Sequence, residues 1–280
     1  MGSIEVVRNR QVVMKDHVFG FPKESDMYIT FTRMRLKIPE NRKGVVLVKN
    51  LYFACDPYMR IRMGNHQDRE FGNFIPGFPI NGFGVAKVLD STHLSFKEGD
   101  LVWGTTGWEE YSIITTPERL FKIHYTDLPC SYHWNMVELL KNRLGFDGAF
   151  NYKEEPDLNA ALKRFFPEGI DIYFENAGGK LLDAVLQNMR VNGRIAVSGL
   201  LSQYNLEQPD GIQNLMYLVF RRIRMQGFAV FDYCSMYPKF LDMVLPYVRE
   251  EKLVYVEDIT EGILHGPAAL LGIFTGQSFG

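Results

Sequence analysis

The chain has 280 residues, enough for one large domain or two smaller ones. Its formal net charge is -2, from 31 Lys and Arg against 33 Asp and Glu, which excludes a strongly basic nucleic-acid or membrane-surface protein. No apolar run approaches the roughly 20 residues that span a bilayer. We therefore expect no nucleic-acid partner and no membrane insertion.

The three cysteines, Cys55, Cys130 and Cys234, lie far apart, and the first residues contain no apolar signal-peptide core. Widely spaced single cysteines are typical of a reducing compartment and not of a disulfide framework. The sequence therefore predicts a cytoplasmic protein.

The first 125 residues predict strands and turns. Short apolar or β-branched runs are separated by Gly, Pro and Asp, at spacings that suit a barrel-like or sandwich domain. The predicted strands are residues 11–15, 32–38, 44–53, 84–89, 101–104 and 110–115.

From about residue 135 the pattern changes to alternating helices and strands. Such a βαβ rhythm implies a parallel sheet. The predicted helices are residues 137–144, 157–166, 180–189, 212–222, 238–249 and 267–274. The predicted strands of this part are residues 170–175, 194–198 and 225–230.

Residues 171–205 give the clearest pattern, because they predict a strand, a glycine turn, a helix, a glycine stop and a second strand. This order is half of a doubly wound nucleotide-binding fold. The other half should come first and should carry a glycine-rich phosphate loop. No Gly-x-Gly-x-x-Gly or variant of it occurs in the sequence.

Four segments together resemble one family. They begin at Cys55-Asp-Pro-Tyr-Met, Pro76-Gly-Phe-Pro-Ile-Asn-Gly, Phe174-Glu-Asn-Ala-Gly-Gly and Gly193-Arg-Ile-Ala-Val-Ser-Gly-Leu-Leu-Ser-Gln-Tyr. In this order they resemble the plant NADPH-dependent 2-alkenal (double-bond) reductases of the zinc-free medium-chain dehydrogenase/reductase superfamily. The resemblance covers nearly the whole chain.

The resemblance implies an α/β protein with two domains. A GroES-like, mostly-β substrate domain would span residues 1–125 and be completed by about 260–280, and a truncated Rossmann-type nucleotide-binding domain would span residues 126–259. The implied cofactor is NADPH, and the implied substrate is a small enal or enone. Hydride would go to its β-carbon and a proton to its α-carbon. The family also implies a homodimer, or a heterodimer with a full-length relative.

Tyr204 matches the family's catalytic tyrosine. The enolate that follows hydride addition needs a hydrogen-bond donor or proton source. A phenol suits this role because it stays protonated at neutral pH. From the spacing alone, the alternative is a tyrosine that only packs after a strand.

Two further residues match substrate-pocket positions of the family, and five match cofactor-binding positions. Tyr58 faces the pocket in relatives, although a loop tyrosine is equally often a core aromatic, and Phe83 stands where some relatives have a tyrosine. Ser278 stands where the family usually has an asparagine near the nicotinamide. The cofactor-binding positions are Tyr152, Asn176, Gly178, Gly199 and Ser278.

We expect no metal. Cys55-Asp56 resembles the zinc-ligand strand of alcohol dehydrogenases, but a catalytic zinc needs three protein ligands. The second segment, residues 76–82, has no His or Glu, and no Cys-x-x-Cys pair exists.

One segment that the family possesses is missing. Asp127-Leu-Pro-Cys-Ser-Tyr-His133 is followed at once by Trp134-Asn-Met-Val-Glu-Leu-Leu-Lys141. Residues 137–141 of this stretch resemble the helix that comes after the family's basic NADPH-selecting loop. The first βαβ unit, at least ~30 residues long, is therefore predicted to be absent. Its loss removes the turn whose backbone N–H groups bind the pyrophosphate.

Three functions stay open on the sequence alone. The chain is an active alkenal reductase, or it is a catalytically impaired splice or truncation variant that acts as a non-catalytic or heterodimerising remnant. The third, a quinone oxidoreductase, is disfavoured by the Cys-Asp-Pro-Tyr-Met and Gln-Tyr-Asn segments.

Overall fold

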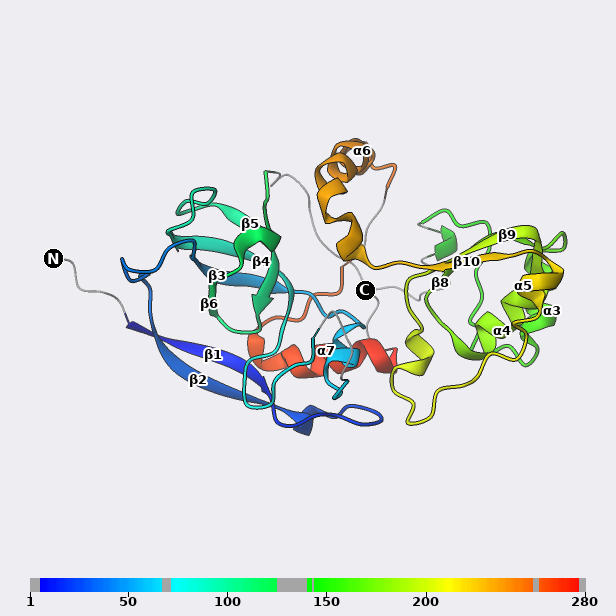
Figure 1. The fold of residues 1–280 in the computed structure, drawn as a ribbon, viewed down its shortest axis with the longest axis horizontal. Coiled ribbons are helices and arrows are strands. Elements are labelled where there is room, and N and C mark those ends of the chain that lie inside the picture. Colours follow the sequence, from blue (N-terminus) through cyan, green and yellow to red (C-terminus); the bar gives the residue numbers. More distant parts are fainter. Residues whose placement is uncertain (1–5, 67–71, 125–139, 143, 254–256, 277–280) are drawn as a thin grey trace. The chain divides into compact units, whose positions relative to one another are not determined.

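The computed structural model describes residues 6–66, 72–124, 140–142, 144–253 and 257–276. The chain divides into two compact units (Figure 1). Unit 1 comprises Met1–Ser131 with Glu257–Gly280, and unit 2 comprises Tyr132–Val256. Each unit has its own cluster of buried apolar side chains.

Unit 1 is built on two antiparallel sheets. β1 (Val6–Met14) pairs with β2 (Met27–Arg35), and a second sheet has the order β6-β3-β4-β5-β7. The mostly-β fold predicted for this part of the chain is confirmed. The strands of the second sheet are β3 (Val46–Phe53), β4 (Asn81–Ser91), β5 (Leu101–Gly107), β6 (Tyr111–Ile114) and β7 (Leu120–Lys122).

Several bounds in unit 1 differ from the predictions. β2 begins and ends earlier than the strand predicted over residues 32–38, because it follows β1 in register from Arg35 opposite Val6 to Met27 opposite Met14. Short elements carry too few residues for a periodic signal, and four of them were not predicted. These are η1 (Glu24–Asp26), α1 (Met59–Arg62), η2 (Pro117–Arg119) and β7.

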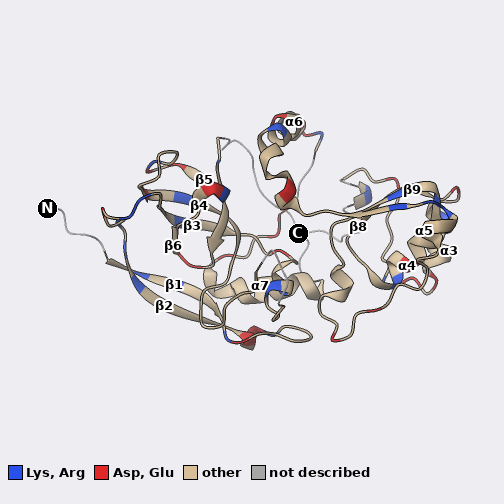
Figure 2. Ribbon diagram, in the orientation of Figure 1, with Lys and Arg blue, Asp and Glu red and all other residues tan. Residues whose placement is uncertain are grey.

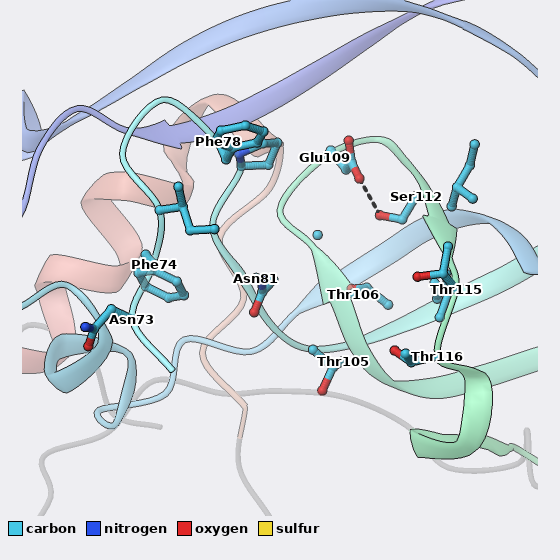
Figure 3. Close-up of a pocket in the computed structure, with 15 residues that line it drawn as sticks. Asn73, Phe74, Phe78, Asn81, Thr105, Thr106, Glu109, Ser112, Thr115 and Thr116 are labelled. Atoms are coloured by element: carbon cyan, nitrogen blue, oxygen red, sulfur yellow. Dashed lines mark hydrogen bonds between the residues drawn. The ribbon is translucent and has the colours of Figure 1, made fainter. Parts of the chain in front are cut away.

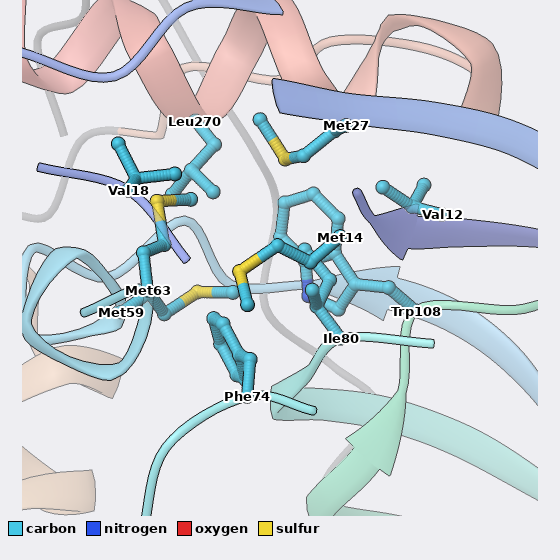
Figure 4. Packing of buried hydrophobic residues seen from close by; sticks show 10 residues of the cluster. All are labelled: Val12, Met14, Val18, Met27, Met59, Met63, Phe74, Ile80, Trp108 and Leu270. Carbon is cyan, nitrogen blue, oxygen red and sulfur yellow. The ribbon is translucent and has the colours of Figure 1, made fainter. Parts of the chain in front are cut away.

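The core of unit 1 joins distant parts of the sequence (Figure 4). Leu270, on α7 (Gly266–Thr275), is fully buried together with Met14, Met59 and Trp108. A Cβ added at Gly266 would lie 3.0 Å from the Trp108 ring, so α7 packs closely on that indole. The late segment with η5 (Ile263–His265) and α7 is therefore part of unit 1.

Unit 2 contains a parallel sheet whose described strands have the order β10-β9-β8. β8 (Ile170–Glu175) and β9 (Met189–Val197) are joined by α4 (Gly179–Asn188), and β10 (Arg224–Gly227) pairs with β9. The truncated Rossmann-type sheet predicted from the sequence is confirmed. The helices outside this βαβ unit are α3 (Leu158–Phe165), η3 (Leu201–Gln203), α5 (Tyr217–Phe220), η4 (Val230–Met236) and α6 (Tyr237–Arg249).

α4 contributes four residues to the buried apolar cluster of unit 2, more than any other described element. Its Leu182, Val185 and Leu186 pack with Met189 and Ile195 of β9. This face is apolar because the residues recur at helical spacing. α4 thereby fixes the carboxyl ends of β8 and β9 side by side.

β8 is an edge strand among the described residues, since it pairs only with β9. Ile172 is 63% exposed and Phe174 is 58% exposed. A strand inside a parallel sheet normally has both faces covered. Ile172 and Phe174 point to the same face of the strand, so this face of β8 is left uncovered by the described residues.

Two helix predictions in unit 2 changed. The helix predicted over residues 212–222 is reduced to α5, and in the stretch before it Asp183 Oδ1 accepts hydrogen bonds from the backbone N–H groups of Gln213 (2.9 Å) and Asn214 (2.8 Å). Of the helix predicted over residues 137–144, residues 140–142 are helical, whereas 137–139 and 143 lie outside the described residues.

Acidic and basic side chains are interspersed over both units (Figure 2). In the part of the chain that the structure describes, no helix is long and apolar enough to cross a bilayer.

Candidate active site

The carboxyl ends of β8 and β9 lie level with each other, with Glu175 opposite Val197. The loops that follow are joined by backbone hydrogen bonds. Ser198 N–H donates to the Glu175 carbonyl at 2.9 Å, and Leu201 N–H donates to the Asn176 carbonyl at 2.8 Å. Ligands of open parallel sheets bind at this end of the strands, so these loops form the first candidate site.

Asn176, Gly199 and Tyr204 meet in these loops. A Cβ added at Gly199 would lie 2.7 Å from Asn176 Oδ1 and 2.9 Å from the Tyr204 hydroxyl oxygen. A side chain at position 199 would collide with these two atoms, so glycine is required there. The structure thus brings together three residues predicted from the sequence. The Asn176 amide and the Tyr204 phenol lie beside the backbone of Gly199, which has no side chain.

Tyr204 is held by its own loop. It ends η3, and its hydroxyl accepts a hydrogen bond from the backbone N–H of Leu200 at 3.3 Å. A phenol that accepts a hydrogen bond still has its own hydrogen to donate. Tyr204 can thus act as a donor to a bound molecule while its ring position stays fixed.

The turn between β8 and α4 is closed by Glu175, which the sequence analysis did not single out. Glu175 is fully buried, and its Oε1 accepts a 2.7 Å hydrogen bond from Gly178 N–H. Burial raises the pKa of the Glu175 carboxyl, and hydrogen bonds from the N–H groups of Gly178, Ala177 and Asn176 oppose that shift. Its Oε2 has no hydrogen-bond partner in the described part of the chain.

The same turn is covered on its other side. Gly178 and Gly179 have φ values of 81° and 56°, which favour glycine. A Cβ at Gly178 would lie 3.0 Å from the Leu200 side chain, and one at Gly179 would lie 3.2 Å from Asp210 Oδ2 and would clash with Gln203. The chain itself therefore fills the space beside the α4 N-terminus.

A nicotinamide cofactor fits this site only in part. Asn176 and Tyr204 are a suitable donor set for a carboxamide ring at the strand ends. The pyrophosphate does not fit the β8–α4 turn, because the Gly178 N–H already donates to the Glu175 carboxylate and the side chains of Leu200, Gln203 and Asp210 lie against the two glycines. We derive no step that depends on a bound pyrophosphate.

Tyr152 and Ser278 are less informative. Tyr152 lies in a turn near Tyr173. The pKa of the Tyr173 phenol is raised, chiefly by burial and then by the charges of Glu175 and Tyr152. The assignment of Tyr152 as a cofactor-binding residue, which the family resemblance implies near the adenosine phosphate of NADPH, stays a prediction. Ser278 lies outside the described residues.

Unit 1 holds the predicted pocket residues. Tyr58 and Phe83 are in edge-to-face contact with ring centroids 6.1 Å apart, and Phe83 lies 5.9 Å from Trp103. Burial raises the pKa of the Tyr58 phenol, which is hydrogen-bonded to the Arg62 side chain and to the Phe83 backbone. The two residues thus form one aromatic cluster, as pocket residues would.

The cysteine segment beside this cluster has the chemistry of a buried thiol. Burial, followed by Asp56 and Asp258, raises the pKa of Cys55 to about 11. Burial also raises the pKa of Asp56. Within the described residues, no group of three or more His, Cys, Asp or Glu is placed to hold a metal ion.

The pockets of the two units lie beside the predicted residues and do not contain them. Unit 1 has a pocket of about 400 Å³ lined by Phe74, Phe78, Asn81 and the hydroxyls of Thr105 and Thr106 (Figure 3). Unit 2 has a pocket of about 560 Å³ lined by Asp157, Lys180, Asp183 and Asp210 among others.

Two family models match the chain. "N-terminal domain of oxidoreductase" matches residues 10–123, and "Zinc-binding dehydrogenase" matches residues 135–245. The chain is similar to the crystal structure of CurA in complex with NADPH from Vibrio vulnificus, at 25% identity and a TM-score of 0.83, with 97% of each chain covered.

The curated relatives agree with the sequence resemblance. The chain is 49% identical to 2-alkenal reductase (NADP(+)-dependent) of Nicotiana tabacum, over 99% of this chain and 97% of the relative. It is 44% identical to (+)-pulegone reductase of Mentha piperita, over 98% of this chain and 97% of the relative.

The tobacco alignment also measures the missing segment. It runs over 333 positions, whereas this chain has 280 residues, so at least 53 positions of the relative, the difference between these two numbers, have no counterpart here. A βαβ unit needs ~30 residues or more, which such a gap contains. With nearly the whole length of both chains aligned, the protein belongs to the plant 2-alkenal reductase family of the zinc-free medium-chain dehydrogenase/reductase superfamily.

Proposed function

We propose that the chain reduces the carbon–carbon double bond of α,β-unsaturated aldehydes and ketones, the class of reaction for which its alkenal-reductase relative is named. One observation carries the proposal, namely that Asn176 and the Tyr204 hydroxyl meet at Gly199 at the strand ends of unit 2. A reduced nicotinamide supplies the hydride in such reactions, and the protein has to orient the substrate and manage charge and proton.

Tyr204 has a side chain suited to stabilising the developing charge and supplying a proton. Hydride addition at the β-carbon places negative charge on the carbonyl oxygen of the substrate, and the enolate then takes a proton at the α-carbon. A phenol O–H aimed at that oxygen stabilises the charge as it develops. Because Leu200 N–H holds the Tyr204 oxygen, the phenol is positioned before substrate arrives.

The aromatic cluster of unit 1 suits the substrate. Tyr58, Phe83 and Trp103 offer flat apolar surface, which matches a conjugated enal. We expect a preference for small or apolar enals over polar ones.

A second function is supported by a different observation. The β8–α4 turn is filled by the chain's own groups and β8 has an open edge, which are the features of a non-catalytic remnant that pairs with a full-length relative. Co-sedimentation with the tobacco reductase, combined with no turnover by the folded chain, would favour this alternative.

The proposal is tested with the purified chain and a panel of trans-2-hexenal, an enone and a para-quinone, each with a reduced nicotinamide donor at millimolar concentration. Loss of donor absorbance at 340 nm and formation of the saturated aldehyde are expected. Turnover of the quinone without the enal would replace alkenal reduction with quinone reduction. A chain that is folded by circular dichroism and turns over none of the three would refute the proposal.

A further inference from the structure

We infer that this chain recognises a reduced pyridine nucleotide by its nicotinamide end alone, and that the pyrophosphate and adenosine add no affinity. The inference rests on the proposed function and adds to it which part of the cofactor is bound. It arises from a disagreement between the family, whose relatives are NADP(+)-dependent by name, and the groups that this chain presents.

Pyrophosphate in doubly wound folds is bound by the backbone N–H groups of a glycine turn at a helix N-terminus. In the described part of unit 2, the β8–α4 turn has this form, with positive φ at Gly178 and Gly179 and α4 directly behind it. At least one of its donors, the N–H of Gly178, is already used. Gly178 N–H bonds Glu175 Oε1 at 2.7 Å, and the N–H groups of Ala177 and Asn176 act on the same carboxylate.

The approach to the turn is closed from outside as well. Gln203 Oε1 accepts a hydrogen bond from Asp210 N–H at 2.7 Å, which holds the Asp210 carboxylate beside Gly179. A diphosphate placed here would meet the Asp210 carboxylate beside Gly179. Like charges at such distances repel.

The neighbouring Lys180 does not make the turn favourable for a diphosphate. Lys180, the first side chain of α4 after the glycines, lines the unit 2 pocket together with Asp157, Asp183 and Asp210. Three carboxylates therefore line the same hollow as this one cation. A single lysine among carboxylates does not replace a ring of backbone donors.

The nicotinamide end is in the opposite situation. Asn176 is exposed, and its side-chain oxygen and the Tyr204 hydroxyl lie next to the bare backbone of Gly199. An amide side chain can both donate to and accept from a carboxamide. The groups that contact the reactive ring thus persist although the phosphate turn is lost.

The test compares four probes by fluorescence or calorimetric titration of the full chain: NADPH, NADH, reduced nicotinamide mononucleotide and adenosine 2′,5′-bisphosphate. We expect the dissociation constants of the three reduced donors to agree within about threefold, and the bisphosphate to displace none of them. The tobacco reductase is the reference, in which NADPH should bind more tightly than the mononucleotide.

Two variants locate the binding. Asn176→Leu should weaken NADPH and reduced nicotinamide mononucleotide by the same factor, about tenfold, because both would lose the same contact. Lys153→Ala, beside the predicted adenosine position, should change neither. Circular dichroism and thermal unfolding confirm that each variant is folded.

The outcomes separate the inference from the proposed function. NADPH binding at least about tenfold tighter than the mononucleotide, or displacement by the bisphosphate, overturns the inference and leaves alkenal reduction standing. Equal binding of the donors without turnover of any enal supports the inference and contradicts the proposed function. Absence of binding of all three donors by the folded chain overturns the inference.

Discussion

The buried carboxylate of Glu175 accepts a 2.7 Å hydrogen bond from the backbone N–H of Gly178, three residues later in the chain. The β8–α4 turn is therefore wrapped around a side chain of its own strand. This relationship fixes the loop on which Asn176 lies, and it also uses the donors that a phosphate would need.

Removal of that carboxylate should destabilise unit 2. Glu175→Ala leaves the turn N–H groups without an acceptor inside the protein, so we expect a loss of about 2–3 kcal/mol in unfolding free energy. Glu175→Gln keeps an oxygen acceptor and should cost about 1 kcal/mol. Urea unfolding measures both. Equal stability of Glu175→Ala and the unmodified chain would show that the hydrogen bond contributes nothing.

The same group predicts a pH dependence. The pKa of Glu175 is raised in the folded protein above the ordinary glutamate value of 4.5, so the folded state binds the proton more tightly than the unfolded chain does. The stabilisation is fully present below pH 4.5 and is lost as the pH rises through the raised pKa. Glu175→Gln cannot titrate, so its unfolding free energy should lack this pH-dependent contribution when it is measured from about pH 4 to about pH 8. A pH profile identical to that of the unmodified chain would contradict the assignment.

Tyr204→Phe should lower kcat for enal reduction by about 10²-fold while KM changes little, because the hydroxyl acts on charge that develops during the reaction. Stability should change by less than about 1 kcal/mol, since the lost acceptor serves an exposed Leu200 N–H. The matched control is Tyr233→Phe, an exposed tyrosine in η4. An unchanged kcat for Tyr204→Phe would leave Tyr204 as a packing residue.

The two described cysteines should differ in reactivity. Burial, Asp56 and Asp258 raise the pKa of the Cys55 thiol to about 11, so almost none of it is thiolate at neutral pH. Cys234 lies in η4, where no residue is fully buried. In a Cys130→Ser background, iodoacetamide at pH 7.5 (about one unit below a free thiol's pKa) should label Cys234 first. Peptide mass spectrometry gives the order, and faster labelling of Cys55 would show that its surroundings are open.

How much the sequence predicts depends on whether a feature is local. The bounds of β8 were predicted to the residue, since Ile170 to Glu175 is a dense apolar run between a glycine and the Asn-Ala-Gly-Gly turn. The length of α5 was not, because the stretch before it is bound by Asp183 on α4, a partner about 30 residues earlier in the chain that no local pattern reveals.

In the candidate site, too, the residues in local motifs were predicted, and the features that depend on the folded sheet were not. Tyr204 and Asn176 were found because they belong to motifs, whereas the role of Glu175 was missed. Its one available signal is an acidic residue at the end of an apolar strand directly before a glycine pair. The meeting of Asn176 and Tyr204 at Gly199 depends on two loops that only the folded sheet brings side by side.

The open edge of β8 should make the chain prone to self-association. Ile172→Lys, at a position that is 63% exposed, should reduce association while it changes unfolding free energy by less than about 0.5 kcal/mol. Ile75→Lys is a matched control, since Ile75 is 64% exposed but lies in unit 1 outside any strand. Sedimentation velocity over a range of concentrations gives the result, and equal effects of the two variants would argue against a role for the edge.

Leu270→Ala should destabilise unit 1 by about 3 kcal/mol, because the side chain is fully buried against Met14, Met59 and Trp108 and leaves a cavity. Trp108 fluorescence reports on the same cluster during unfolding. Leu264→Ala is the control, since Leu264 is exposed in η5. A loss below about 1 kcal/mol for Leu270→Ala would mean that α7 is only loosely attached.

The packing of α7 against the first strands has a consequence for biosynthesis. A ribosome delivers residues 6–124 first, then the whole of unit 2, and only afterwards the segment that carries Leu270. Unit 2 can close its βαβ unit while the nascent chain is still growing, whereas Met14 and Trp108 have to wait for a helix made last. The first part of the polypeptide to emerge is thus the last to finish folding, and during that interval its unfinished core is a surface for chaperones.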